Sequence, residues 1–238
     1  MIFDVDFSLN NRNFKANFGN VIEVGGDTEA LYNEGYEAGK EAGAMPLYYA
    51  RSLSSLWQGV TFPENTELTI KVKSVSSIEY SFMSSKNLKS VKLISDTPDT
   101  VISMNGAFRE TYQLELVNLT EFNRKFSSIN FCFYANSGAL KTILGALDVS
   151  ECTSFPTSTF QAYKLEDIEF VPNTICANIW FDRCTNLTHD SLMSIINGLK
   201  DYSGTGTTHT CTLGSTNLAK LTDEEIAIAT EKKGWTLA

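Results

Sequence analysis

The chain has 238 residues, of which 42% are hydrophobic and 20% are charged, and its formal net charge is −9. This length suffices for one large hydrophobic core with a small appendage, and the composition is that of a folded globular protein. The negative charge and the lack of any cluster of Lys and Arg exclude a phosphate-backbone partner, so we expect no nucleic-acid binding.

The amino-terminal segment, residues 1–44, is the most acidic part of the chain, with eight acidic against three basic residues. It lacks the basic start and the apolar run of a secretory signal. No apolar run in the chain approaches the roughly 18 residues of a membrane span, and neither end carries a lipidation motif. We therefore expect a chain that is made and folded in the cytoplasm, without membrane insertion.

Alternation of apolar and polar residues predicts two short strands within residues 1–26. The first alternates over residues 3–7 and the second over 14–18, with a turn at 9–12 between them. Such alternation buries one face and leaves the other in water. A lone hairpin is only marginally stable, so we expect it to pack on another element or on a partner chain.

Residues 29–43 predict a helix in which three glycines, four residues apart, lie along one face. A row of small residues allows another helix to approach closely, while the charged residues of this helix exclude a bilayer. The row indicates either a self-association arm, which would make the protein a homo-oligomer through residues 1–44, or a flexible connector that is only partly helical.

Residues 45–80 predict an irregular amino-terminal cap for the segment that follows. After Met45-Pro46, residues 48–57 read as a first irregular coil, and residues 68–72 alternate as a strand.

Residues 81–186 repeat one pattern, in which a Phe is followed about six residues later by Leu and then by two more apolar residues. The marking residues are Phe82, Phe108, Phe133, Phe160 and Phe181, which lie 26, 25, 27 and 21 residues apart. A period of this size with an L-x-x-V-x-L core predicts a leucine-rich solenoid, in which stacking joins the apolar ridges of the units into one core. The alternative is an ordinary β-rich domain with chance spacing.

The residues between the inward apolar positions are expected to face outward on a shared sheet, provided that Leu88, Leu114, Leu140 and Leu165 lie in adjacent layers. Solenoids use such exposed surfaces to bind extended partners. The predicted contact residues are Lys89, Ser90, Lys92, Glu115, Asn118, Lys141, Thr142, Glu166, Asp167 and Glu169. Their charges run from basic at one end to acidic at the other. The alternative is that these mixed charges only keep a water-exposed face soluble and bind no partner.

Residues 187–238 predict a carboxy-terminal cap made of two helix-then-strand units 34 residues apart. The first helix is expected over residues 187–199. In the second unit, Thr222 with Glu225 predicts a capping box and Gly234 predicts a C-cap.

No pattern in the sequence supports catalysis or a bound cofactor. His189, Asp190 and Ser191 are sequence neighbours, whereas the members of a catalytic triad converge from separate elements. Gly204-Thr-Gly206 lacks the Lys-Ser/Thr continuation of a phosphate loop. Five cysteines and two histidines show no zinc-site spacing, and the thiols are expected to be buried as small hydrophobic groups. We therefore expect a protein that is not an enzyme and holds no metal or cofactor.

Two stretches resemble the repeat unit A-F-x-x-C-x-x-L-x-x-I-x-L of the BspA-like leucine-rich repeat family. These stretches are Ala107-Phe108-x5-Leu114-x2-Val117-x-Leu119 and Phe181-x-x-Cys184-x-x-Leu187. The resemblance covers about residues 50–200 and implies surface recognition or adhesion, with a protein or a cell-surface glycan as partner. The predicted fold is thus an α/β-leaning β solenoid, an irregular leucine-rich repeat over residues 45–238 with a helix-strand cap and a small amino-terminal β-hairpin and helix arm.

The amino-terminal strands, followed by Tyr32-Asn-Glu-Gly-Tyr-Glu-Ala-Gly39, resemble the leaders of accessory structural proteins in phages and prophages of gut Firmicutes. A virion protein that is assembled in the cytosol and released by lysis needs no export signal. The two resemblances together imply a non-enzymatic recognition or structural protein associated with a phage or prophage tail. The alternatives are a bacterial BspA-like surface adhesion protein and an intracellular protein-interaction scaffold.

Overall fold

The structure is a computed structural model that describes the backbone of three short strands near the amino terminus and most of the chain after residue 52. The described residues are 4–9, 12–17, 22–24, 53–72, 75–95, 97–134 and 139–238. The predicted glycine-rich helix of residues 29–43 and the start of the predicted cap, residues 45–52, lie outside them.

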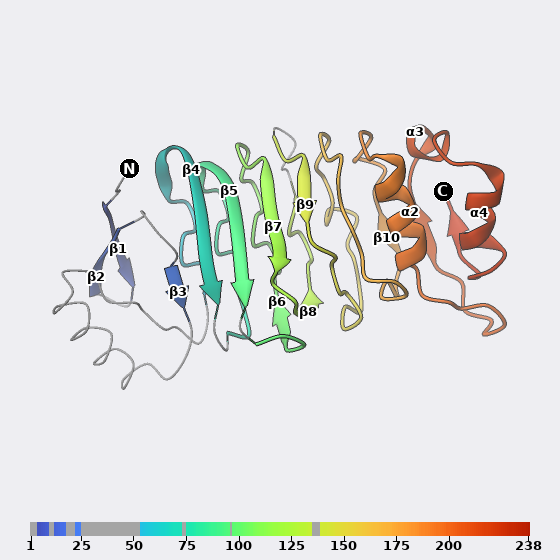
Figure 1. Ribbon diagram of the computed structural model, residues 1–238, viewed down its shortest axis with the longest axis horizontal. Helices are drawn as coiled ribbons and strands as arrows, with labels where there is room; N and C mark the ends of the chain where they lie inside the picture. Colours follow the sequence, from blue (N-terminus) through green and yellow to red (C-terminus); the bar gives the residue numbers. More distant parts are fainter. Residues whose placement is uncertain are drawn as a thin grey trace.

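Five strands form an open parallel sheet in the order β3-β4-β5-β7-β9, in which neighbours in space follow one another along the chain (Figure 1). The strands are β3 (Ile22–Val24), β4 (Thr61–Val72), β5 (Lys86–Ser95), β7 (Leu116–Glu121) and β9 (Thr142–Leu144). Parallel neighbours require the chain to cross back between them. We call each strand of this main sheet, or the extended segment that continues the stack after β9, together with the segment that returns from it, a layer.

The returning segments carry a second parallel pair, β6 (Val101–Ser103) with β8 (Lys125–Ser128). Figure 1 shows these two strands pointing in the opposite direction to those of the main sheet. The apolar face of the main sheet therefore lies opposite the apolar face of the returning segments. The buried residues of both sides belong to one hydrophobic core.

A row of stacked aromatic rings passes through this core from layer to layer. The rings are those of Trp57, Phe82, Phe108, Phe133, Phe160 and Phe181. Successive centroids lie 5.0, 5.3, 6.0, 5.7 and 4.7 Å apart, and all six residues are buried. The row thus contains the five marking phenylalanines and, in addition, Trp57. The unit around Trp57, which the sequence predicts to be part of an irregular cap, stacks on the next layer as the later units do.

One turn shape brings the first four of these rings into the core. A residue with positive φ lies two positions before each ring: Ser55 (59°), Tyr80 (54°), Gly106 (59°) and Phe131 (55°). The ring residues then bond to the following layer, since Trp57 N–H donates to Ser81 O (2.8 Å) and Phe82 N–H donates to Ala107 O (2.9 Å). The left-handed residue reverses the chain locally, so that the aromatic side chain points inward.

The inner leucines Leu88, Leu114, Leu140 and Leu165 are all buried. The residues that follow them bond from layer to layer: Glu115 N–H donates to Lys89 O (2.8 Å), Lys141 N–H to Glu115 O (3.0 Å) and Glu166 N–H to Lys141 O (2.8 Å). The four leucines therefore lie in adjacent layers, which is the arrangement that the predicted solenoid requires.

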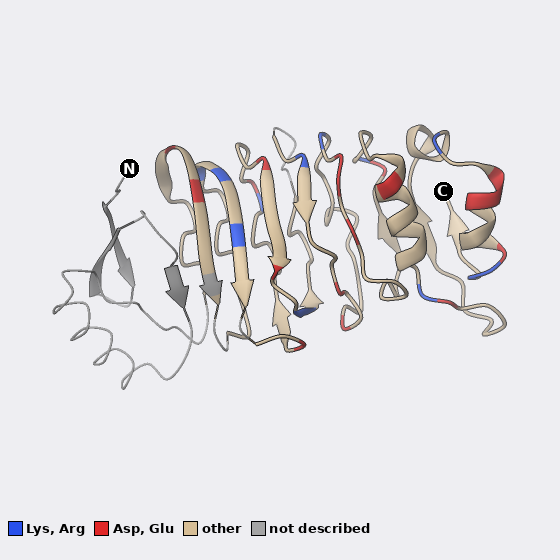
Figure 2. Ribbon diagram, viewed as in Figure 1, with Lys and Arg blue, Asp and Glu red and all other residues tan. Residues whose placement is uncertain are grey.

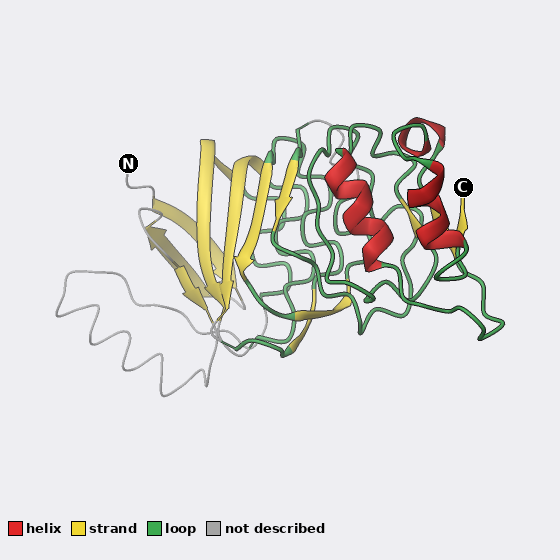
Figure 3. Ribbon diagram, turned by 45° about the vertical axis from the view of Figure 1, so that its right-hand side comes forward, coloured by secondary structure: helices red, strands yellow, loops and turns green. Residues whose placement is uncertain are grey.

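Helices replace strands at the carboxy-terminal end of the molecule, where Figure 3 shows α2 and α4 beside the last layers. The elements there are β10 (Ile179–Trp180), α2 (His189–Gly198), β11 (Thr210–Thr212), α3 (Ser215–Leu218), α4 (Asp223–Thr230) and β12 (Thr236–Leu237). The strands β10, β11 and β12 form a small parallel sheet in that order.

The capping box of Thr222 and Glu225 opens α4, where Glu225 N–H donates to Thr222 Oγ1 and Thr222 N–H donates to Glu225 Oε2. The prediction of a C-cap at Gly234 is wrong, because α4 ends with Glu231 as its C-cap. The carbonyl of Ala229, near the end of α4, instead accepts from Trp235 N–H (3.0 Å), so the chain turns back at Gly234 after the helix has already ended.

Helix α2 closes the edge of the extended segment that follows β9 in the stack. Ile168 N–H donates to Ser191 Oγ (3.0 Å), and Phe170 N–H donates to Ser194 Oγ (2.9 Å). The two serines stand three residues apart, and therefore on one face of the helix, while the two amides alternate along the preceding segment. The serine hydroxyls thus accept hydrogen bonds from two backbone amides that would otherwise need the carbonyls of a further strand.

Near the amino terminus, β1 (Asp4–Leu9) and β2 (Arg12–Asn17) pair antiparallel, with Leu9 opposite Arg12. The alternating pattern predicts strands at these positions. The short strand β3 was not predicted, and it pairs in parallel with residues 70–72 of β4. Part of the segment 1–44 is therefore an edge of the main sheet.

Candidate binding surface

The ten predicted contact residues lie on outward-facing positions of the main sheet or of the segment that follows it. Pairing of Ser90 with Leu116, of Leu116 with Thr142 and of Thr142 with Asp167 aligns their side chains in a row across the layers. The neighbouring row runs from Lys92 through Asn118. The sequence-predicted residues are therefore side by side in space, although they are spread over 81 positions from 89 to 169.

A further row of side chains alternates in charge from one layer to the next. It contains Glu67, Lys89, Glu115, Lys141 and Glu166, linked by the backbone bonds and strand pairing of their layers. Figure 2 shows the alternation of acidic and basic positions across the strands. Opposite charges on adjacent strands stabilise a sheet by about 0.2–1 kcal/mol per pair. Neighbouring layers therefore place opposite charges next to each other along this row.

The predicted contact residues change from basic at one end of the face to acidic at the other. At the end predicted to be basic, the structure shows no excess of positive charge. Lys92 Nζ pairs with Glu121 Oε1, and Lys89 Nζ lies 4.0 Å from Glu67 Oε1. Neither acidic partner was among the predicted contact residues, and each lies on a strand adjacent to the lysine that it neutralises. This end of the face carries little net charge.

The other end of the face keeps an acidic character. Glu166, Asp167 and Glu169 are all exposed. Asp167 accepts hydrogen bonds from Thr142 Oγ1 (3.3 Å) and Thr188 Oγ1 (3.4 Å), which hold its carboxylate at the surface between β9 and α2. The charge pattern of the face thus runs from neutral to acidic.

Two apolar residues interrupt the polar rows. Leu116 is partly exposed on β7, and Leu144 on β9 is 39% exposed. Both occupy outward positions that pair with polar ones, Leu116 with Ser90 and Leu144 with Asn118. The face therefore offers apolar contact area in addition to hydrogen-bonding groups.

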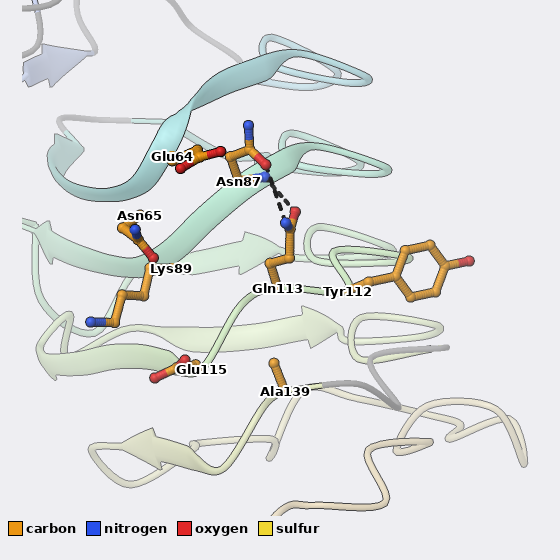
Figure 4. A pocket seen from close by; sticks show the side chains of 8 residues that line it. All are labelled: Glu64, Asn65, Asn87, Lys89, Tyr112, Gln113, Glu115 and Ala139. Carbon is orange, nitrogen blue, oxygen red and sulfur yellow. Dashed lines mark hydrogen bonds between the residues drawn. The ribbon is translucent and has the colours of Figure 1, made fainter.

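An open hollow of about 390 Å³ lies where the layers enter the main sheet (Figure 4). Its lining includes Glu64 and Asn65 from β4, Asn87 and Lys89 from β5, and Gln113 just before β7. Glu115, Tyr112 and Ala139 complete it. The hollow shares Lys89 and Glu115 with the predicted contact residues, and so adjoins the charged row.

The side chains of Asn87 and Gln113 hold each other in place beside the hollow. Asn87 N–H donates to Gln113 Oε1 (2.6 Å), and Gln113 Nε2 donates to Asn87 Oδ1 (3.1 Å), as Figure 4 shows. Asn87 Nδ2 also donates to Phe62 O (2.8 Å). The two amides are thus fixed by the fold, and each keeps further donor and acceptor capacity.

Sequence reasoning missed this amide pair, although a signal for it exists. Asn87 and Gln113 each stand immediately before an inner leucine, Leu88 and Leu114, in the two clearest copies of the repeat. The predicted contact residues all follow the inner leucine of their repeat, whereas Asn87 and Gln113 precede it.

His189, Asp190 and Ser191 have the residue types of a catalytic triad, but they do not contact one another as a triad does. His189 Nε2 lies 2.9 Å from Glu225 Oε1, which joins α2 to α4, whereas Ser191 Oγ accepts from Ile168 N–H. The Thr222 backbone N–H, and after it His189, lower the pKa of Glu225. His189 and Ser191 therefore serve the packing of the helical cap, whereas the Asp190 side chain is fully exposed.

Among the described residues, no three His, Cys, Asp or Glu side chains come together as a metal-ligand group. Nor does any helix in this described portion have the length and apolar composition of a membrane span.

Four of the five cysteines are buried, and Cys176 is partly exposed. Burial raises the pKa of the Cys152 and Cys184 thiols to about 12, and it also raises the pKa of Cys132 and Cys211. Only the thiolate reacts readily with disulfide reagents.

We expect an Ellman titration of the native protein to show one fast thiol, that of Cys176, and four that react only on unfolding in guanidinium chloride. Cys176→Ser should remove the fast phase and leave the four slow thiols unchanged. Fast reaction of the native Cys176→Ser variant would contradict this assignment.

Comparison of the chain with protein-family models, with curated proteins and with solved structures finds no match.

Proposed function

We propose that residues 45–238 form a leucine-rich-repeat solenoid of the BspA-like kind and that the outward face of its main sheet is the contact surface of a non-enzymatic binding protein. The observation that carries the proposal is the continuity of the face. The outward side chains of successive layers stand in rows over a single buried core. Stacked layers give such a surface the length and rigidity that recognition of an extended partner requires.

The chemistry of the face favours an extended polar partner. Its rows carry amides, hydroxyls and charges of both signs, with Leu116 and Leu144 as apolar points between them. A polyanion such as a nucleic acid needs clustered positive charge, and the lysines at one end of this face are paired with glutamates. A protein or a cell-surface glycan fits these groups.

The setting that we propose is a phage or prophage tail, where the protein recognises the host surface or has a structural role. The resemblance of the amino-terminal segment to phage leaders supports it, and so does the hairpin of β1 and β2 within that segment. In this setting residues 1–44 attach the protein or bring copies together, and the sheet face stays available for contact.

The test is binding of fluorescently labelled protein to a panel of intact gut Firmicutes strains. We expect the double reversals Lys89→Glu with Lys92→Glu, and Glu166→Lys with Glu169→Lys, each to weaken binding to a recognised strain about tenfold, as for the loss of roughly 1.4 kcal/mol. The long side chains reversed here project from the face, so the fold is retained.

Matched controls are Lys232→Glu and Glu151→Lys, which reverse exposed charges outside the main sheet and should leave binding unchanged. Equal weakening by the sheet variants and by these controls would indicate a non-specific charge effect. Absence of binding to every strain would contradict the proposed role in host-surface recognition.

A further inference from the structure

The hollow beside Asn87 and Gln113 has its origin in a change of residue size from one layer to the next. The position before the inner leucine is Asn87 in one layer, Gln113 in the second and Ala139 in the third. The first two side chains bond to each other, whereas the methyl group of Ala139 does not reach back to Gln113. Figure 4 shows the space that this leaves between Gln113 and Ala139.

The groups around this space are those that recognise alcohols. Asn87, Gln113 and Asn65 provide amide donors and acceptors, while Glu64 and Glu115 provide acceptors. A hydroxyl group donates one hydrogen bond and accepts others, so a ring of adjacent hydroxyls matches alternating donors and acceptors. Because the amide pair is already held in place, little conformational freedom is lost on binding.

The charges around the hollow disfavour an anionic ligand. Lys89 is its one positively charged lining residue among the described residues, and this ammonium group lies 4.0 Å from Glu67 and stands in the row beside Glu115. Glu64 adds a further negative charge. A phosphate or carboxylate would meet net repulsion here, whereas a neutral polar ligand would not.

Tyr112 supplies an apolar surface at the rim of the hollow. Its side chain is 56% exposed and extends away from the amide pair in Figure 4. A tyrosine ring offers a flat apolar face with a polar tip, which suits interfaces that are partly wet. A pyranose ring has the complementary structure, with an apolar face of C–H groups and a rim of hydroxyls.

We infer that this hollow is a binding subsite for one or two units of a neutral saccharide, whose hydroxyls bond to Asn87 and Gln113 and whose apolar face packs on Tyr112. Its volume of about 390 Å³ lies within the range of small-molecule sites. The inference rests on the proposed function and names the class of ligand that the sheet face recognises. The subsite is open, so a longer glycan continues across the rows of the sheet.

The experiment is a binding screen of the full chain on an array that holds neutral hexose and N-acetylhexosamine oligosaccharides beside sialylated, sulfated and phosphorylated ones. We expect a neutral oligosaccharide to bind, and titration calorimetry with that compound to give a dissociation constant about tenfold weaker for Gln113→Ala and for Tyr112→Ala. Salt up to 0.5 M, roughly the range in which surface charges are screened, should change the affinity little.

Two residues at equivalent positions outside the hollow serve as matched controls. Asn186 precedes Leu187 as Gln113 precedes Leu114, and Tyr163 stands two residues before Leu165 as Tyr112 does before Leu114. Tyr163 is also similarly exposed, at 42%. Asn186→Ala and Tyr163→Ala should bind the oligosaccharide as the unchanged protein does.

Binding of only anionic glycans, binding of no glycan at millimolar concentration, or equal affinity in all four variants would each overturn the inference. The proposed function fails separately, when the charge reversals on the sheet leave cell binding unchanged. If those reversals abolish cell binding while Gln113→Ala and Tyr112→Ala retain it, the sheet face is the contact surface and the saccharide subsite is wrong.

Discussion

Phe108→Ala is expected to lower the free energy of unfolding by about 3–5 kcal/mol, as for other buried phenylalanines. The ring is fully buried and stacks on both Phe82, at 5.3 Å, and Phe133, at 6.0 Å. Its removal leaves a cavity in the middle of the aromatic row and removes two ring contacts at once. Urea denaturation followed by circular dichroism measures the change.

The control for this substitution lies four residues along in the same layer. Tyr112→Ala removes a ring of similar size from the surface, where the residue is 56% exposed, and should change stability by no more than about 0.5 kcal/mol. Phe108→Leu keeps most of the buried volume and should cost less than Phe108→Ala. If Phe108→Ala and Tyr112→Ala were equally stable, the aromatic row would not be a main element of the core.

Gly145→Ala is expected to destabilise the protein by about 3 kcal/mol or more. Gly145 has φ +92°, and a Cβ atom there would lie 2.7 Å from the carbonyl carbon of Leu119 and 2.8 Å from Thr120 N. These are backbone atoms of the adjacent layer, which cannot move aside as the end of a side chain can. The backbone of β7 at Leu119 and Thr120, or that of the turn after β9, would have to shift.

Gly204→Ala is the matched control, because it shares the positive φ, at +69°, but has no atom within 4 Å of the added Cβ. It should lower the free energy of unfolding by about 1–2 kcal/mol, because the added side chain only has to adopt the left-handed backbone conformation. The difference between the two variants in thermal or urea denaturation isolates the close approach of adjacent layers. Equal losses would mean that the layers have room to separate at Gly145.

The aromatic row and the inner leucines could be predicted from the sequence because each recurs at nearly constant spacing and each has one role, to fill the core. Trp57 belongs to the same row, at 25 residues before Phe82, but the strand residue that pairs with Leu88 is Thr66, which is no leucine and follows Trp57 after nine residues instead of six. The bulge between Thr61 and Glu67 in β4 takes up these extra residues. Spacing alone does not reveal a bulge.

The charge pattern of the face could be predicted only in part. The outward lysines were identified from alternation within each repeat, but the partners of Lys89 and Lys92 lie on the neighbouring strands, at Glu67 and Glu121. Which residues pair across strands depends on register, and register depends on the loops between layers. The hollow was missed for a related reason, since it depends on the difference between Gln113 and Ala139 in adjacent layers.

The two serines of α2 that bond to Ile168 N–H and Phe170 N–H have a consequence for assembly. A fibre built by adding one molecule's sheet to the next, head to tail, needs a free strand edge at both ends of every copy. Here one end is occupied by hydroxyl groups from the molecule's own helix. Head-to-tail growth through the stacked layers is therefore blocked at the α2 end of each copy.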